Sequence, residues 1–420
     1  MASGPLRIPV RSPLALAAGG LAVAISAVHL LISLATNVPG IFNDFYDYWG
    51  AAVLLNRGHD PYDTAALTSV VNAAGLHSQV GGGYSYPLVL AQALRPLGLL
   101  DPHVAALVFS GVSLLALGVA VSVTLGGLNP LRFPTAIGGG IAAAFFPPVI
   151  GSLHFGQAGI LILVPLAFAW RSVLPGPMIA AASAVKLFPA TGFLAQLTRP
   201  SRASAIAILS GVGTLAALVL LAQVGAHGSL LEHPGSLLGP DTFWTNQSVN
   251  GWVSRLALPS NWTNPPLPQL PVTPVVAAVS AFLAAAVIVV LVRTRDAPAH
   301  ARLALCLWLG VVVAPKNSFW NYTPLLFAAA SVWRLRAGRW WPPILALIGW
   351  LLIEAQSHID VDRDTFYRAG PGLTWLSSLA LYGAIFIGGV LAHLLLSNPG
   401  RSGARYTRRA LAMASAREQL

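Results

Sequence analysis

Apolar runs of about 20 residues recur along the 420-residue chain. An α-helix rises about 1.5 Å per residue, so each run is long enough to cross the ~30 Å hydrocarbon core of a bilayer. Only 9% of the residues are charged, against about 25% in soluble proteins, which excludes a soluble enzyme and a disordered chain. The sequence therefore predicts an all-α, polytopic integral membrane protein with about 10–12 transmembrane helices. We expect crossings near residues 14–36, 84–100, 104–125, 134–151, 155–172, 176–197, 203–224, 272–292, 301–316, 318–333, 340–356 and 374–396.

The formal net charge of +11 is concentrated in short basic clusters between the apolar runs, as the positive-inside rule predicts for cytoplasmic loops. No basic stripe interleaved with aromatic residues is present, so we expect no nucleic-acid partner. Placing Arg7 in the cytoplasm puts two long polar loops, residues 37–83 and 225–270, outside the cytoplasmic membrane. We expect a membrane-embedded domain over residues 1–398 and a basic tail over residues 399–420, with both termini in the cytoplasm.

Two interpretations of the first half of the chain stay open. If all twelve runs cross the membrane, the turn at His154–Gln157 lies inside. If residues 84–100 and 176–197 are re-entrant half-helices, ten helices cross and the same turn lies outside. The proline breaks at Phe146-Pro147-Pro148 and Phe188-Pro189 favour the second interpretation, because irregular backbone is tolerated in a membrane only where it lines a cavity.

The first outer loop carries several acidic residues in a short stretch. Asp44 follows the first apolar run directly, and a carboxylate at the membrane boundary can be desolvated enough to act as a general base. Alternatively, Asp44 caps a helix that begins near Phe45. Asp47, one helical turn further, either raises the pKa of its neighbour by like-charge repulsion or faces water. Tyr62 and Asp63 either contact a sugar or close a turn.

Five short motifs, taken in order, resemble those of one enzyme family. The chain is similar to the polyprenol-phosphate-mannose-dependent α-mannosyltransferases of actinobacteria, which are membrane glycosyltransferases of the C-type superfamily. The resemblance covers residues 42 to about 325. Its motifs are Asp44-Phe45-Tyr46-Asp47-Tyr48 with Ala51-Ala52, Gly58-His59-Asp60-Pro61-Tyr62-Asp63, Tyr86-Pro87, Gly156-Gln157 with Lys186-Leu187-Phe188-Pro189, and Asn246-Gln247-Ser248 followed by Arg255.

This resemblance implies an inverting transferase that moves a sugar, usually mannose, from a polyprenyl-monophosphate donor to a glycolipid or polysaccharide acceptor at the outer face of the membrane. The family's presumed catalytic base maps onto Asp44. The expected partners are the lipid-linked donor, the acceptor and membrane lipid. We expect no cofactor, although Asp44, Asp47, Asp60 and Asp63 offer oxygen ligands that could hold a hard divalent cation. Close rivals are an arabinofuranosyl or other pentosyl transferase and a lipid or sugar transporter.

Other candidate residues each allow a structural interpretation as well. Lys186 interrupts an apolar run and either pairs with the lipid phosphate or extends to the interface. Gln157 either binds substrate or hydrogen-bonds between helices. Asn246 and Gln247 in the second loop suit sugar recognition. Arg255 and Lys316 are candidate partners for the phosphate.

The family motif near the end of the match is altered in this chain. The family commonly has Ser-Pro-X-Ser-Trp followed by an acidic residue and histidines. Here the proline and Trp320 are kept, but Asn321 occupies the acidic position and Tyr322 a histidine position. We include Trp320 and Asn321 among the expected substrate contacts. The altered segment leaves open a further alternative, an inactive scaffold that keeps the fold.

Overall fold

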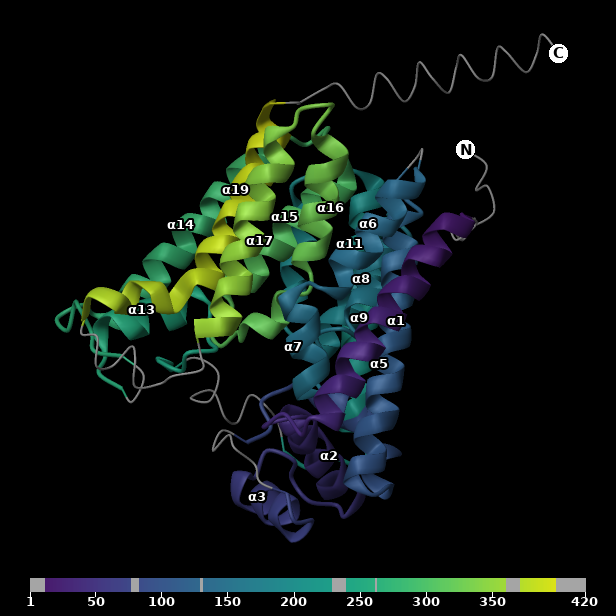
Figure 1. Ribbon diagram of the computed structural model, residues 1–420, viewed down its shortest axis with the longest axis vertical. Helices are drawn as coiled ribbons and strands as arrows, with labels where there is room; N and C mark the ends of the chain where they lie inside the picture. Colours follow the sequence, from purple (N-terminus) through teal and green to yellow (C-terminus); the bar gives the residue numbers. More distant parts are fainter. Residues whose placement is uncertain are drawn as a thin grey trace. The chain divides into compact units, whose positions relative to one another are not determined.

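The computed structural model describes residues 12–76, 83–128, 131–228, 239–260, 263–359 and 371–397. Within these ranges every regular element is a helix (Figure 1). The predicted basic tail, residues 399–420, and the N-terminal Arg7 lie outside the described residues. The absence of strands among the described residues agrees with the predicted all-α class.

Five of the described helices are long and apolar enough to cross a membrane. A bent pair, α6 and α7, makes a sixth if it is counted as one span, with an angle of 45° at the break. The break falls where Pro147 and Pro148 begin α7, because proline lacks the N–H that would continue α6. The chain is therefore a multi-pass membrane protein. The spans are Pro13–Ala35, Pro102–Leu125, Arg202–Gln223, Val272–Arg293 and Pro371–Ser397, and the pair is Phe133–Ala144 with Pro147–Phe155.

Several other predicted crossings form shorter helices. The run at 84–100 contains α4 (Leu88–Ala93) and a 3-10 turn, and the run at 176–197 begins with α9 (Pro175–Val185) before the chain turns. Neither run is one continuous helix, which is the pattern expected of the re-entrant interpretation. The total of 10–12 crossings stays a prediction, because only five or six described helices qualify by length and composition.

The chain divides into two compact units. Unit 1 comprises residues 1–190, 210–239 and 318–323, and unit 2 comprises residues 191–209, 240–317 and 324–420. The elements within unit 1 are α1 (Pro13–Ala35), α2 (Asn43–Asn56), α3 (Thr64–Ala73), α4, η1 (Leu97–Leu99), α5 (Pro102–Leu125), α6 (Phe133–Ala144), α7 (Pro147–Phe155), α8 (Leu163–Trp170), α9 and η4 (Phe319–Tyr322). The elements within unit 2 are α10 (Leu194–Leu197), α13 (Val249–Ala257), α14 (Val272–Arg293), α15 (Ala299–Val313), α16 (Leu325–Leu335), α17 (Trp341–Ile359), η5 (Pro371–Ser378) and α19 (Leu379–Ser397). Residues of η2 (Phe188–Phe193) and α11 (Arg202–Gln223) belong partly to each unit.

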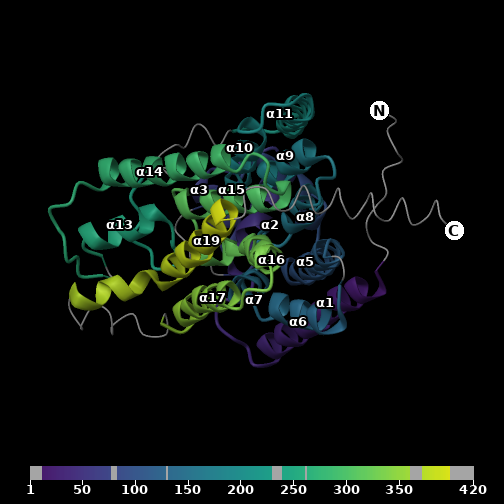
Figure 2. The same ribbon diagram turned by 90° about the horizontal axis from the view of Figure 1, so that it is seen from above.

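In unit 1, α1 packs along both α5 and α6 (Figures 1 and 2). Small residues allow this close approach: a Cβ at Gly19 of α1 would lie 2.5 Å from the backbone oxygen of Gly118 on α5. Membrane helices have no hydrophobic driving force between them, so such close backbone contact is a main source of their association. Of these three helices, α5 also contacts α2 (Asn43–Asn56), the helix that follows α1.

The segment predicted to be the first outer loop, residues 37–83, is more structured over its described residues than its polar composition suggests. It contains α2 and α3, and α2 is buried from Phe45 to Leu55 against α3, α4, α5 and η1. Polar links fix its ends: the Trp49 indole donates to the carbonyl of Leu100 at 3.1 Å, and Asn56 donates to the carbonyl of Arg95 at 2.9 Å. A helix buried on all sides is a rigid base for the functional residues at its start.

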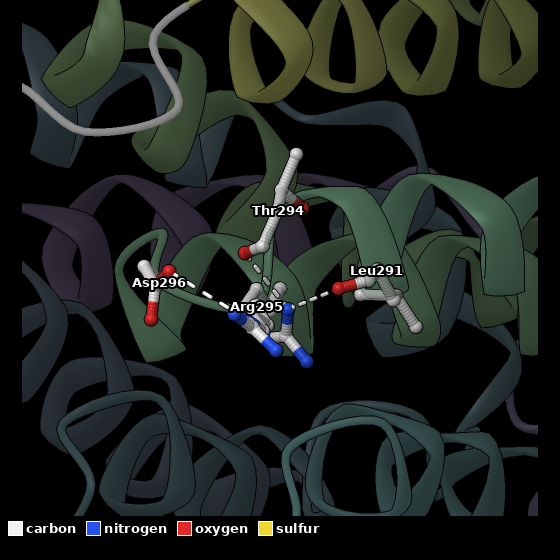
Figure 3. Close-up of polar contacts among 5 residues, drawn as sticks. Leu291, Thr294, Arg295 and Asp296 are labelled. Carbon is white, nitrogen blue, oxygen red and sulfur yellow. Dashed lines mark hydrogen bonds and ion pairs between the residues drawn. The ribbon is translucent and has the colours of Figure 1, made fainter.

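In unit 2, α17 and α19 lie side by side (Figures 1 and 2), and α15 and α16 pack against each other and against α19. Figure 3 shows the end of α14, where the exposed Arg295 and Asp296 form an ion pair with N–O distance 3.8 Å. Arg302, by contrast with these exposed residues, has a buried side chain. It donates to the carbonyls of Leu291 at 2.5 Å and Thr294 at 2.8 Å, so it satisfies the free carbonyls at the end of the helix.

Candidate active site

Asp44 lies in the first turn of α2, but its side chain does not cap the helix. The N-cap residue is Phe42, which has a left-handed backbone (φ 64°) and makes no side-chain capping bond. The Asp44 carboxylate instead accepts a hydrogen bond from the side-chain amide nitrogen of Gln157. Its side chain stays partly exposed. The capping alternative is therefore not what the structure shows.

Gly156 brings Gln157 to Asp44. This glycine ends α7 with φ +68°, and a Cβ there would lie only 2.5 Å from Cβ of Phe45. The close approach is fixed further by the backbone N–H of Phe42, which donates to the carbonyl of His154 at 2.7 Å. The end of α7 and the start of α2 thus lie on the same side of unit 1, which favours the interpretation with ten crossings.

Three donors converge on the side-chain oxygen of Gln157. They are the hydroxyls of Tyr48 at 3.1 Å and Tyr86 at 2.9 Å and the ammonium of Lys186 at 3.0 Å. Burial raises the pKa of Tyr48 well above its usual value of 10, so its hydroxyl keeps the proton that it donates. Gln157 is itself only 4% exposed. Its amide therefore connects a buried cation to the Asp44 carboxylate.

Lys186 follows the end of α9 and is 4% exposed. Its ammonium donates to Gln157, to the Tyr86 hydroxyl at 3.4 Å and to the side-chain oxygen of Asn321 on η4. Asn321 is held in place because η4 is anchored by a bond from the Ser152 hydroxyl to the carbonyl of Trp320 at 2.8 Å. The altered family motif therefore supplies Lys186 with a neutral acceptor where the family commonly has an acid.

We call Asp44, Tyr48, Tyr86, Gln157, Lys186 and Asn321 the Gln157 cluster; all six residues belong to unit 1. Burial raises the pKa of the Asp44 carboxyl from 3.8 to about 6, although the hydrogen bond from Gln157 and the positive charge of Lys186 act to lower it. A carboxylate with such a pKa is ionised at neutral pH and still basic enough to accept a proton from a hydroxyl. The arrangement suits general base catalysis.

Sequence reasoning did not select Tyr48 or Tyr86 as site residues. Both occur in the motifs that carry the family resemblance, and Tyr86 stands directly before Pro87 at the start of α4. The available signal for Tyr86 was its position directly before the proline at the start of α4. It was missed because no spacing rule connects residues 48, 86 and 157, which come together only in the fold.

The other predicted residues of unit 1 take supporting places. Asp63 caps α3, accepting from the backbone N–H groups of Ala65 at 2.9 Å and Ala66 at 3.1 Å, as the turn interpretation expects. The Tyr62 hydroxyl donates to the carbonyl of Tyr86 at 2.9 Å. Asp47 is 8% exposed, and Trp320 stacks on Phe155 with ring centroids 4.4 Å apart.

The predicted residues of the second loop form a separate network inside unit 2. Arg255 is fully buried and donates to the carbonyls of Phe243 and Asn246 and to the hydroxyls of Ser377 and Ser378, at distances of 2.7–3.1 Å.

The side-chain amides of Asn246 and Gln247 in this network also form hydrogen bonds within unit 2. The Asn246 side chain accepts from the backbone of Asn317 at 3.1 Å, and that of Gln247 donates to the carbonyls of Trp244 and Ser377, both at 2.8 Å. Lys316 is exposed. In this structure Asn246, Gln247 and Arg255 stabilise unit 2, and their contacts with substrate stay predictions.

No group of three or more histidine, cysteine, aspartate or glutamate residues in the described ranges could hold a metal ion. Two acids of the first loop have local roles: Asp63 caps α3, and Asp60 accepts from the backbone of Tyr62 at 2.8 Å.

Comparison with protein families identifies a relationship. The profile of glycosyltransferase family 87 matches residues 84–315, more than half of the chain. No curated protein matches the chain. The matched segment contains Tyr86, Gln157 and Lys186 of the Gln157 cluster, whereas Asp44 and Asn321 lie outside it. Because this match covers more than half of the chain, the chain belongs to glycosyltransferase family 87.

Proposed function

We propose that the protein transfers a sugar, mannose, from a polyprenyl-monophosphate donor to a glycolipid or polysaccharide acceptor at the outer face of the cytoplasmic membrane. The observation that supports this proposal most directly is the Asp44 carboxylate, which is partly exposed and accepts a hydrogen bond from the Gln157 amide. Burial raises the pKa of this carboxyl to about 6, which suits a general base. The resemblance to polyprenol-phosphate-mannose-dependent α-mannosyltransferases supports the donor and the sugar. Membership of glycosyltransferase family 87 supports the reaction class.

The proposed reaction is a single displacement with inversion. The acceptor hydroxyl attacks the anomeric carbon from the face opposite the phosphate, and Asp44 takes the hydroxyl proton as the new C–O bond forms. The bond between the anomeric carbon and the phosphate oxygen breaks, and the polyprenyl phosphate leaves with the bonding electrons. Among the cations singled out in the sequence, Lys316, which belongs to unit 2, has an exposed side chain. Its role stays part of the proposal.

The test is a transfer assay with the full-length protein in lipid nanodiscs, labelled polyprenyl-phosphate-mannose and membrane glycolipids. We expect Asp44→Asn to lower the rate by about 10²–10⁴-fold, the usual contribution of a general base. The matched control is Asp101→Asn, because Asp101 only caps α5 through the N–H groups of His103 and Val104 and asparagine caps equally well.

Each outcome has a distinct meaning. Full activity of Asp44→Asn rejects the assigned base. Transfer from lipid-linked arabinofuranose in place of mannose rejects the proposed sugar and keeps the reaction class. Absence of turnover with every lipid-linked sugar tested contradicts the proposed function and favours a transporter or a scaffold.

A further inference from the structure

We propose that Lys186 and Gln157 are positioning residues for Asp44: the lysine sets which way the Gln157 amide faces, and the amide holds the carboxylate. This inference rests on the proposed function in one respect, the assignment of Asp44 as the base. It replaces the expectation that Lys186 pairs with the lipid phosphate and that Gln157 binds substrate.

The first step of the argument is the orientation of the amide. A glutamine side chain presents an acceptor oxygen on one side and an NH₂ donor on the other, and its neighbours decide which side faces where. A lysine ammonium can only donate, and Lys186 lies 3.0 Å from the Gln157 oxygen. Rotating the amide would set NH₂ against this ammonium. The NH₂ group must therefore face Asp44, as the structure has it.

The second step is that Lys186 has no donor left for a phosphate. An ammonium group has three N–H donors, and Lys186 contacts three acceptors: Gln157, Tyr86 and Asn321. The side chain is also nearly closed to solvent, at 4% exposure. A lipid phosphate would have to displace one of these partners, which hold the lysine from different segments of the chain.

The third step concerns the basicity of Asp44. A direct ion pair with lysine would hold a carboxylate at a low pKa and make it a weak base. Here the amide of Gln157 stands between the two charges, and no carboxylate in the described ranges forms a salt bridge with Lys186. The lysine thus acts on Asp44 through an intervening dipole, which orients the carboxylate and leaves it basic.

The other ionisable groups near Asp44 do not supply this function. Tyr48 and Tyr86 donate to the same oxygen of Gln157, so they support the amide without adding a charge. Asp47 on the same helix carries a like charge. His154 on α7 is directed to the carbonyl of Pro39 at 3.2 Å. Among these groups, Lys186 alone donates an ammonium N–H to the Gln157 oxygen.

The test measures the titration of Asp44 in full-length protein in nanodiscs. Infrared spectra of wild type minus Asp44→Asn, recorded across pH, isolate the carboxyl band of Asp44 without requiring activity. We expect Lys186→Met to move its midpoint upward from about 6, by about one pH unit or more. Gln157→Glu, which keeps the shape but replaces the donor by a second carboxyl, should also move it upward.

Kinetics separate positioning from substrate binding. In Lys186→Met we expect kcat to fall most at low pH and to recover in part at high pH, with an unchanged KM for the lipid donor. A raised donor KM with an unmoved Asp44 midpoint would show instead that Lys186 binds the phosphate, and would overturn the proposal. An unmoved midpoint in both variants also overturns it.

The failure of this inference is distinguishable from failure of the proposed function. If Asp44→Asn keeps full activity, the base assignment fails. If Asp44→Asn is inactive but neither midpoint moves, the base stands and the positioning role fails. Lys186→Met removes a buried charge and is expected to fold, with elution as a single species as the check. Gln157→Glu provides the second variant if it does not.

Discussion

Asp44 is desolvated, hydrogen-bonded to Gln157 and close to the charge of Lys186, and these features shift the pKa of its carboxyl in opposite directions. Burial destabilises the ionised form and raises the pKa to about 6, while Gln157 and Lys186 favour ionisation. A general base works best when its pKa lies somewhat below the operating pH, because it is then ionised and still accepts a proton in the transition state. Its environment therefore prepares this one side chain for the reaction.

The pH dependence of the wild-type reaction follows from this pKa. The carboxylate is the active form, so activity is full well above pH 6, halves near pH 6 and falls about tenfold for each further unit below it. The measurement is kcat/KM against pH from 4.5 to 8.5 in nanodiscs. An acid limb centred near 4, the value of a solvated aspartate, would contradict the desolvated environment of Asp44.

At the scale of elements, the end of α7 is the critical junction of the site. Gly156→Ala adds a Cβ that would lie 2.5 Å from Cβ of Phe45, at a backbone conformation (φ +68°) that costs an L-residue about 1–2 kcal/mol. We expect this variant to displace Gln157 from Asp44 and to lower transfer activity by about tenfold or more. The assay is the mannose transfer reaction described above.

The matched control for this variant is Gly138→Ala on α6. No atom lies within 4 Å of a Cβ at Gly138, and alanine is the better helix former. This control should keep its activity and its stability. If Gly156→Ala retains wild-type activity, the junction of α7 with α2 does not position the site.

Long apolar helices were predictable from the sequence, and short broken ones were not. The bounds of α1, α5, α11 and α14 lie within about two residues of the predicted runs, because continuous hydrophobicity over a bilayer thickness leaves few alternatives. The pieces around α4 and α9 depend on prolines and on polar contacts such as Lys186 with Asn321, which are distant in sequence. Asp44, Gln157 and Lys186 were selected as site residues from the sequence, but the hydrogen bonds that connect them were not predicted.

At the scale of the whole molecule, the natural cysteine content makes the orientation directly testable. Cys306 is the single cysteine and is fully buried, so wild-type protein should not react with a membrane-impermeant maleimide. We expect His59→Cys, exposed in the first outer loop, to react in intact cells. Asp296→Cys, exposed beside the end of α14, should react only after the cells are permeabilised.

The reverse pattern would place Asp44 in the cytoplasm and contradict the proposed outer active site. A third variant, His154→Cys, distinguishes ten from twelve crossings. Because Phe42 donates to the carbonyl of His154 at 2.7 Å, we expect it to react from the same side as His59→Cys. Reaction from the opposite side would reject the re-entrant interpretation.

The pairing of Lys186 with the neutral Asn321 has a consequence for turnover. With Asp44 ionised and Lys186 protonated, the Gln157 cluster starts the proposed reaction with no net charge. When Asp44 accepts the acceptor's proton, the cluster becomes cationic at the moment the phosphate diester becomes a dianionic monoester. If the proposed reaction takes place, we expect this positive charge to attract the polyprenyl phosphate until Asp44 gives up the proton. Loss of that proton would restore neutrality and release the product, so that each cycle frees the acceptor's proton together with one polyprenyl phosphate.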